Sequence, residues 1–248
     1  MPDWLGIEGR RVLVAGGAGT LGAALVGGFL EQGAVVGVLD VSQDGLAALD
    51  ERVAVRGEVD LSDPESSRAA VAGARDELGG LDVFVHCVGI SDRRPIEDYS
   101  AAEWDRILAV NLTSAFHTAT EAAVGMRAQG RGRIVFFSSV AGRSGHKHHG
   151  PYAATKGAIN QLMRVIAHEY AADGVTANAV APGYMDTTLT REYLAANPAK
   201  RAALVELIPA GRFGNLAEVV GPVLFLCSEQ ASFITGQVLY IDGGRTIV

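Results

Sequence analysis

Tyr152 and Lys156 lie four positions apart, which places both side chains on one face if the segment is helical. A free phenol has a pKa near ~10 and is a poor base at neutral pH. A neighbouring ammonium favours the phenolate, and a shift of about three pKa units corresponds to about 4 kcal/mol. We therefore predict that Lys156 tunes Tyr152 to act as a general acid/base toward an alcohol.

Ser139 is the third residue of this group. It ends an apolar run over residues 133–139, thirteen positions before Tyr152. A hydroxyl at the end of a strand can hold the oxygen of a reacting substrate. A tyrosine and a lysine at this spacing also occur by chance in many chains, so the prediction depends on the elements that position the three residues.

A glycine turn near the N-terminus has the context of a dinucleotide site. Residues 11–15 are a short β-branched run, residues 16–22 contain Gly17-x-Gly19-x-x-Gly22, and residues 23–32 have a helical pattern. Such a turn lets the backbone approach a pyrophosphate, and the helix N-terminus offers free N–H groups to it. The alternative is a glycine-rich turn that serves packing alone.

Asp40 ends the next apolar run, residues 34–39, and lies 18 positions after Gly22. An acid at about this spacing binds the ribose hydroxyls of the adenosine half. Its charge repels a 2′-phosphate, and no arginine adjoins it, so we expect NAD (NADH) rather than NADP. Asp40 can also cap a helix that begins near Ser42, and the two roles are compatible.

The remaining chain alternates apolar runs with helical patterns. Further strands are expected at 53–57, 81–87, 133–137, 175–180 and 237–241, and helices at 63–78, 100–127, 152–172, 190–207 and 217–227. This alternation predicts an α/β fold with βαβ units around a parallel sheet, as one doubly wound domain over residues 1–248. Ligands bind beyond the carboxyl ends of such strands. The residues expected at those ends are Gly16, Asp40, Asp60, Gly89, Ser139 and Pro182.

The composition of the chain argues against several classes of binding partner. The chain has 248 residues, 48% of them hydrophobic, and a net charge of -7 with both signs interspersed, which argues against nucleic acid as a partner. Cys87 and Cys227 lack the spacing of metal ligands or of a disulfide framework. The histidines of 146–149 are too close together on one loop to favour a metal site. No signal peptide or membrane-spanning run is evident, so we expect a cytoplasmic protein.

In order and spacing, these motifs resemble the short-chain dehydrogenase/reductase family from Leu5 to Gly244. The resemblance implies a Rossmann-type sheet of about seven strands in the order 3-2-1-4-5-6-7, and usually a homotetramer. It also implies that Tyr152 is the acid/base, that Ser139 positions the substrate oxygen, and that Lys156 lowers the tyrosine pKa and holds the nicotinamide ribose. Asn111 then anchors a water molecule beside the lysine.

The same resemblance implies the cofactor contacts. The family's glycine motif falls on Gly16 and Gly22, with Thr20 at its middle glycine, and the family's Asn-Asn-Ala-Gly segment falls on residues 86–89 with three of four positions changed. His86 offers a hydrogen bond in place of the lost asparagines. The residues expected to contact the cofactor are Gly16, Gly19, Thr20, Leu21, Gly22, Asp40, Val41, Asp60, Leu61, Cys87, Val88, Gly89, Tyr152, Lys156, Pro182, Gly183, Met185 and Thr187.

The substrate pocket is expected from residues 91–95, 144–149 and Tyr184, with 188–210 as a lid. The basic pair Arg93-Arg94 and the histidine loop 146–149 either hold an anionic substrate or form a solvated basic loop. We expect an NAD-dependent oxidoreductase acting on a small polar alcohol or ketone, such as a polyol, sugar, sugar acid or hydroxy acid. The alternatives are an NADPH-dependent 3-oxoacyl-thioester reductase and a catalytically silent nucleotide-binding scaffold.

Overall fold

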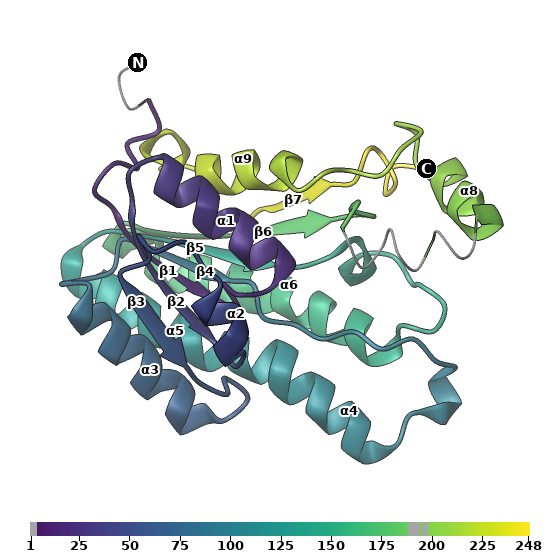
Figure 1. The fold of residues 1–248 in the computed structure, drawn as a ribbon, viewed down its shortest axis with the longest axis horizontal. Coiled ribbons are helices and arrows are strands. Elements are labelled where there is room, and N and C mark those ends of the chain that lie inside the picture. The colour runs from purple at the N-terminus through teal and green to yellow at the C-terminus, as the bar shows by residue number, and fades with distance from the viewer. Residues whose placement is uncertain (1–3, 188–193, 195–197) are drawn as a thin grey trace.

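The computed structural model describes residues 4–187, 194 and 198–248 and places seven parallel strands in one sheet (Figure 1). The strand order is β3-β2-β1-β4-β5-β6-β7, which confirms the predicted topology. The strands are β1 (Arg11–Ala15), β2 (Val35–Asp40), β3 (Val55–Glu58), β4 (Val83–His86), β5 (Gly132–Phe137), β6 (Val175–Pro182) and β7 (Val238–Ile241).

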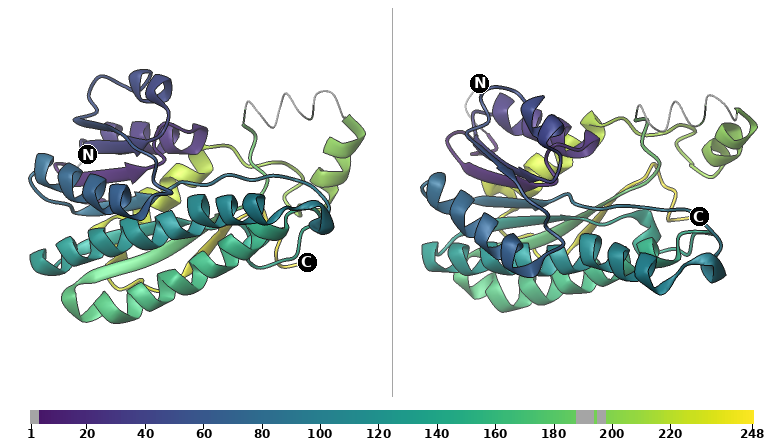
Figure 2. Two further views of the ribbon diagram at one scale, coloured as in Figure 1. Left: turned by 90° about the horizontal axis from the view of Figure 1, so that it is seen from below. Right: turned by 60° about the horizontal axis from the view of Figure 1, so that its bottom comes forward.

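Helices cover both faces of the sheet (Figures 1 and 2). The helices are α1 (Thr20–Glu31), α2 (Gln43–Ala47), α3 (Pro64–Glu77), α4 (Ala101–Leu108), α5 (Ser114–Gln129), α6 (Gly150–Tyr170), α8 (Pro198–Glu206) and α9 (Ala217–Leu226). One face packs on α3, α5 and α6, and the other packs on α1 and α9. Because both faces are buried, the strands read as continuous apolar runs.

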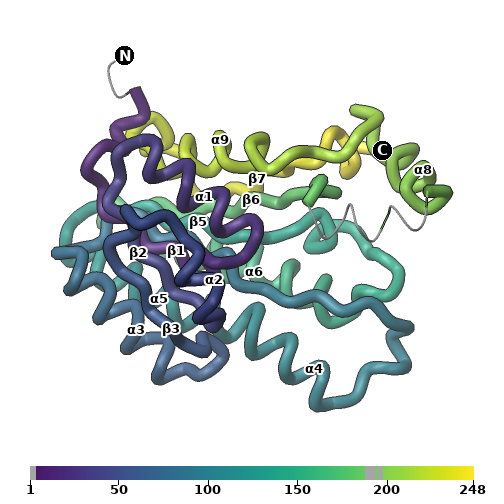
Figure 3. The backbone as a smooth tube through the Cα atoms, in the orientation of Figure 1, coloured from purple at the N-terminus to yellow at the C-terminus, as the bar shows by residue number. Residues whose placement is uncertain are grey.

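Strand alternation divides the core into two clusters. Along β1, Leu13 belongs to the cluster under α3, α5 and α6, whereas Val12 and Val14 belong to the cluster under α1 and α9. Successive side chains of a strand point to opposite faces, which explains the division. The tube in Figure 3 shows β1, β2 and β3 side by side, and the strand order places β4 on the other side of β1. The point where the strand order reverses lies between β1 and β4.

The predicted helix over 100–127 is wrong in one respect. It begins as expected after Ser100, whose side chain forms a reciprocal capping box with Glu103. A π-helical turn over Ala109–Thr113 then interrupts it and separates α4 from α5. Single π turns within helices often occur at functional sites, and this one contains Asn111.

The helix expected over 190–207 is described from Pro198 onward, as α8, whereas residues 190–193 and 195–197 lie outside the described residues. In this region Leu194, Ile208 and Phe213 form a separate apolar cluster, against which Tyr184, Leu204 and Val205 pack. In the part of the chain that the structure describes, no helix is long and apolar enough to cross a membrane. The same residues contain no cluster of histidine, cysteine and acidic side chains that could hold a metal ion.

Candidate active site

Tyr152 and Lys156 lie on the first turns of α6, as the spacing predicts. The helix begins at Gly150, and Pro151 occupies a first-turn position where its missing N–H and fixed φ are tolerated. The ammonium of Lys156 lies 5.6 Å from the centroid of the Tyr152 ring. It donates a 2.7 Å hydrogen bond to the carbonyl of Phe137 at the end of β5. The lysine is therefore fixed between the helix and the carboxyl edge of the sheet.

Ser139 lies just past the end of β5 and joins this pair. Its hydroxyl accepts a 3.1 Å hydrogen bond from the amide of Ala141 and also bonds to the Tyr152 side chain, which lowers the tyrosine pKa. Burial has the larger effect, however, and raises the pKa of Tyr152 above its ordinary value. Burial also lowers the pKa of Lys156 to about 8. In the protein alone, the expected lowering of the tyrosine pKa by Lys156 is thus not realised.

The side chain of Asn111, in the π-helical turn, makes three hydrogen bonds. Its amide oxygen accepts a 2.8 Å hydrogen bond from the backbone N–H of Ile90, and its amide nitrogen donates to the Ile90 carbonyl at 3.0 Å. The same nitrogen donates to the hydroxyl of Thr155 at 3.1 Å, one residue before Lys156. Asn111 therefore joins the segment after β4 to the helix that carries the tyrosine and the lysine.

The glycine turn combines tight packing with an open edge. Gly16 has a φ of +77°, and a Cβ there would lie 2.8 Å from the backbone nitrogen of Val88. A Cβ on Gly22 would lie 2.1 Å from the carbonyl oxygen of Gly16, so both glycines are required sterically. At Gly19 the nearest atom is 3.7 Å away, which leaves that position open.

The N-terminus of α1 begins at this open edge. Thr20 is its first residue, no side chain caps the helix, and the first internal hydrogen bond runs from Ala23 N to Gly19 O. The N–H groups before Ala23 therefore have no partner within the helix, and such groups bind anions. The turn is therefore tightly packed at Gly16 and Gly22, and its open edge at Gly19 forms, with the first N–H groups of α1, a cradle that can accept an anion.

The carboxylate of Asp40 closes one side of the cradle. It accepts hydrogen bonds from the amide of Ala18 in the glycine turn at 2.9 Å and from the amide of Ser42 at 3.0 Å. The cap of α2 is Ser42 rather than Asp40, because the Ser42 hydroxyl accepts a hydrogen bond from Gly45 N at 3.1 Å. The capping alternative for Asp40 is therefore wrong.

Beyond the turn, several predicted cofactor residues follow the carboxyl ends of strands. Asp60 follows β3 and accepts a hydrogen bond from Ser62 N at 2.9 Å, while Leu61 is buried and Val41 is exposed. A Cβ on Gly89 would lie 3.3 Å from the Lys156 ammonium, which brings the segment after β4 against the predicted catalytic lysine.

His86 does not replace the family's asparagines as a ligand-facing donor. Its ring is fully buried and pairs with the hydroxyl of Ser114 at 3.0 Å, and burial lowers its pKa to about 3. Ser114 in turn donates to the carbonyl of Val110 in the π-helical turn. The neutral imidazole of His86 is therefore a core group that supports the turn containing Asn111.

The segment after β6, which contains Gly183, Met185 and Thr187, is held by a partner that the sequence did not reveal. The amide of Asp186 donates to the carbonyl of Gly214 at 2.7 Å, and Gly214 N donates to the carbonyl of Tyr184 at 3.0 Å. Stretches that pair only in three dimensions give no sequence signal, which is why Gly214 escaped prediction.

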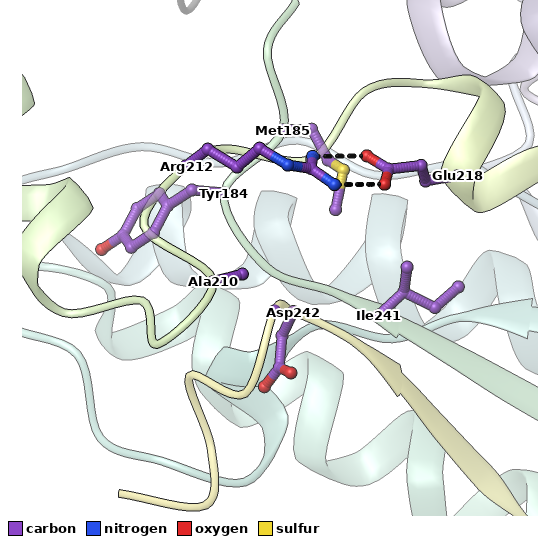
Figure 4. A pocket seen from close by; sticks show the side chains of 9 residues that line it. Tyr184, Met185, Ala210, Arg212, Glu218, Ile241 and Asp242 are labelled. Atoms are coloured by element: carbon purple, nitrogen blue, oxygen red, sulfur yellow. Dashed lines mark hydrogen bonds and ion pairs between the residues drawn. The ribbon is translucent and has the colours of Figure 1, made fainter.

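A small cavity of about 70 Å³ lies behind this segment (Figure 4). Arg212 and Glu218 close one side with two hydrogen bonds, of 2.8 and 2.6 Å. On the opposite side, Asp242 accepts hydrogen bonds from Gly244 N and Thr246 N. These charged groups already have protein partners, so they stabilise the loops rather than offer ligand contacts.

A wider hollow of about 430 Å³ lies between the two loops that were expected to line the substrate pocket. The loops are joined by a hydrogen bond from Arg94 N to the carbonyl of His148 at 3.2 Å. The side chain of Arg94 is paired with both Asp92 and Glu103. The two arginines of this loop therefore differ, and only Arg93 lacks an ion pair within the described residues.

Comparisons with known proteins agree with this geometry. Residues 16–246 match the family model described as enoyl-(acyl carrier protein) reductase. The chain is 34% identical to gluconate 5-dehydrogenase of Gluconobacter oxydans, with 99% of this chain and 98% of that protein covered. The chain belongs to the short-chain dehydrogenase/reductase family.

Other members of the short-chain dehydrogenase/reductase family show how wide its chemistry is. The 3-oxoacyl-[acyl-carrier-protein] reductase FabG of Vibrio harveyi is 34% identical, with 98% of this chain and 100% of that protein covered. The crystal structure of a gluconate 5-dehydrogenase from Burkholderia cenocepacia in complex with NADP and tartrate aligns with a TM-score of 0.93 and 32% identity, covering 99% of this chain and 98% of that chain. Family membership alone thus does not separate a sugar-acid substrate from an acyl thioester.

Proposed function

We propose that this short-chain dehydrogenase/reductase transfers a hydride between NAD(H) and a small polar alcohol or ketone that carries an anionic group. The observation that carries the proposal is the meeting of Ser139, Tyr152, Lys156 and Asn111 at the carboxyl edge of the sheet. These four residues come from three separate segments. Their convergence beside the glycine turn supports catalysis over a silent scaffold.

In the proposed mechanism, Tyr152 gives a proton to the carbonyl oxygen during reduction or takes it from the alcohol during oxidation. Ser139, already bonded to the tyrosine, holds the same substrate oxygen. Lys156 places a positive charge close to the Tyr152 ring, and Asn111 orients the helix turn that carries the lysine. Bound NAD would supply the hydride chemistry, and the protein orients the substrate toward it.

The glycine turn and the N-terminus of α1 are the features that suit the binding of a dinucleotide. Gly16 and Gly22 keep the turn tight, the open edge at Gly19 leaves room for a pyrophosphate, and the unpaired N–H groups of α1 suit its charge. Asp40 would bind the adenosine ribose and favours NAD. Three solved relatives contain bound NADP, so cofactor preference needs a direct test.

Asp40→Asn removes the charge of this residue and keeps one of the two oxygens that accept hydrogen bonds from the amides of Ala18 and Ser42. We expect the ratio of kcat/KM with NAD to kcat/KM with NADP to fall by about tenfold or more, because a close like charge disfavours the 2′-phosphate by about 1.4 kcal/mol or more. Initial rates with both cofactors measure the ratio. Asp44→Asn, on the exposed surface of α2, removes an equal charge and should leave the ratio unchanged; an equal change in both variants would contradict the role of Asp40.

The anionic part of the substrate is assigned to Arg93. Arg93 is an exposed side chain on the loop that is hydrogen-bonded to the histidine loop, and its positive charge acts to lower the pKa values of His146, His149 and Tyr152. An arginine without a carboxylate partner is suited to a substrate carboxylate. This supports an acid, such as a sugar acid or hydroxy acid, over a neutral alcohol. Tartrate, found in the complex of a relative, is such an acid.

Arg93→Gln should raise KM for a keto acid by about 10-fold to 100-fold, because a charge-assisted hydrogen bond contributes about 1.5–3 kcal/mol. KM for a neutral ketone should remain unchanged. Arg94→Gln is the matched control, since its guanidinium is paired with Asp92 and Glu103, and it should act on thermal stability instead. If Arg93→Gln affects acids and neutral ketones equally, the basic loop is only a solvated surface.

The test of the whole proposal is NADH and NADPH formation over polyols, sugar acids, hydroxy acids and secondary alcohols, together with ketone reduction. Turnover with NAD and a small acid supports the proposal. Turnover of a 3-oxoacyl thioester with NADPH alone would favour the alternative reductase, which the 34% identity to FabG keeps open. Failure of every substrate, with cofactor binding retained, would favour the scaffold.

We also propose that residues 1–248 act as one domain, with residues 188–210 as its lid. Residues 188–193 and 195–197 of the lid lie outside the described residues. A homotetramer is supported by large apolar side chains left exposed on α4, α5 and α6, namely Trp104, Phe116, Val124 and Val165. Light scattering at micromolar concentration measures the oligomeric state.

A further inference from the structure

The imidazole of His149 lies beside the predicted catalytic tyrosine and has no hydrogen-bond partner among the described residues. The residue directly precedes α6, and its ring centroid is 5.8 Å from that of Tyr152. Its Nδ1 is buried and unpaired, and the described residues provide no hydrogen bond to either ring nitrogen. Buried polar side-chain atoms are usually paired, so an orphan next to the reacting tyrosine suggests that a ligand supplies the partner.

The charge state of this imidazole narrows the chemistry of that ligand. Burial lowers the pKa of His149 to about 4, and the nearby charges of Arg93, His146 and His148 act in the same direction. The ring is therefore neutral in the physiological range. A neutral imidazole has one donor and one acceptor nitrogen, so it pairs well with a hydroxyl group, which also has both functions. It attracts an anion less than the nearby Arg93 does.

We propose that His149 binds a hydroxyl group of the substrate close to the carbon that exchanges the hydride. This inference rests on the proposed function, because Tyr152 must hold the reacting oxygen for His149 to meet a neighbouring group. Arg93 then binds the anionic group and His149 binds the hydroxyl. The favoured substrate class is a hydroxylated keto acid and its alcohol, in preference to a simple oxo acid or an acyl thioester.

Two ketones that differ in their hydroxyl groups test the inference. Both 5-keto-D-gluconate and 5-oxohexanoate have a carboxylate and a ketone at the fifth carbon, but only the first has hydroxyls. His149→Leu should lower kcat/KM for 5-keto-D-gluconate by about 10-fold to 100-fold and leave kcat/KM for 5-oxohexanoate unchanged. His149→Gln retains a donor and an acceptor and should restore most of the loss.

His148→Asn is the matched control. It removes an exposed imidazole from the same loop, and asparagine tolerates the φ of 65° at this position. This variant should not change the ratio of kcat/KM between the two ketones. Equal losses of both activities in His149→Leu would mean that the ring only positions Tyr152, which overturns the inference while the proposed function stands.

A binding measurement separates this inference from a failure of the proposed function. The ¹⁵N resonances of the His149 ring are followed in the wild-type protein with NAD while gluconate is added. A shift of these resonances, absent when hexanoate replaces gluconate, supports hydroxyl binding even if neither ketone is reduced. Resonances that stay unchanged at saturating gluconate overturn it.

Discussion

Tyr152→Phe should lower kcat by a factor of about 10² to 10⁴, the usual contribution of a positioned acid/base. The substitution removes a single oxygen from a half-buried ring at the start of α6 and keeps the packing of the ring. Binding of NADH, followed by its fluorescence, should remain close to that of the wild type. Loss of turnover with binding retained separates a catalytic role from a structural one.

The control for this variant is Tyr170→Phe, at the other end of the same helix. Tyr170 is also buried, and its ring contacts the guanidinium of Arg127 rather than the site. It loses the same atom and should keep full activity. A Tyr152→Phe enzyme that keeps more than about a tenth of the wild-type kcat would be inconsistent with the proposed acid/base, since it would have lost less than the smallest usual contribution.

Lys156→Met should lower kcat by at least about 100-fold, because Tyr152 loses its cation, and should also change how stability depends on pH. The folded protein has a Lys156 pKa of about 8, against 10.5 for the ordinary side chain. Between these values the unfolded chain binds more protons than the folded chain, so the stability of the wild type rises with pH in that window. Across the whole window, Lys156 changes the free energy of unfolding by about 3 kcal/mol. Below about pH 8 its contribution does not vary with pH.

Urea unfolding of the wild type and of Lys156→Met is measured between pH 7 and pH 10. The difference between their free energies of unfolding reports Lys156, because the contributions of the other titrating groups cancel. The free energy of unfolding of the wild type should rise relative to Lys156→Met as pH increases. Lys147→Met, at an exposed loop position, should give no pH-dependent difference. A difference that falls with pH would mean that the buried ammonium is stabilised rather than penalised by the fold.

The pKa of Tyr152 depends on tertiary packing as well as on the local spacing of residues along the helix. The spacing to Lys156 is correctly read as a shared helix face, because helix geometry is local. In the protein alone, burial outweighs the hydrogen bond from Ser139 and raises the pKa of Tyr152, so the predicted lowering depends on the charge of a bound cofactor as well as on Lys156. Burial depends on what the rest of the chain packs against the ring. Lowering of the pKa must therefore come from further positive charge, such as that of a bound oxidised nicotinamide.

The two arginines of the substrate loop, Arg93 and Arg94, are also distinguished only by the tertiary structure. Both have equal charge and adjacent positions, and the sequence left open whether they bind an anion. Tertiary structure pairs Arg94 with Asp92 and Glu103 and leaves Arg93 without an ion pair among the described residues. The distinction arises because Glu103 is brought back to the loop by the capped start of α4.

By itself, the sequence determined the alternation of strands and helices, the glycine turn after β1 and the residue types of the site. These features depend on short-range periodicity, turn chemistry and helix caps, which neighbouring residues specify. Only the tertiary structure decided the π-helical turn at Asn111, the burial of His86 and the unpaired imidazole of His149. The physical reason is that hydrogen-bond pairing and burial are set by segments distant in the chain, which meet only when the sheet and its helices pack together.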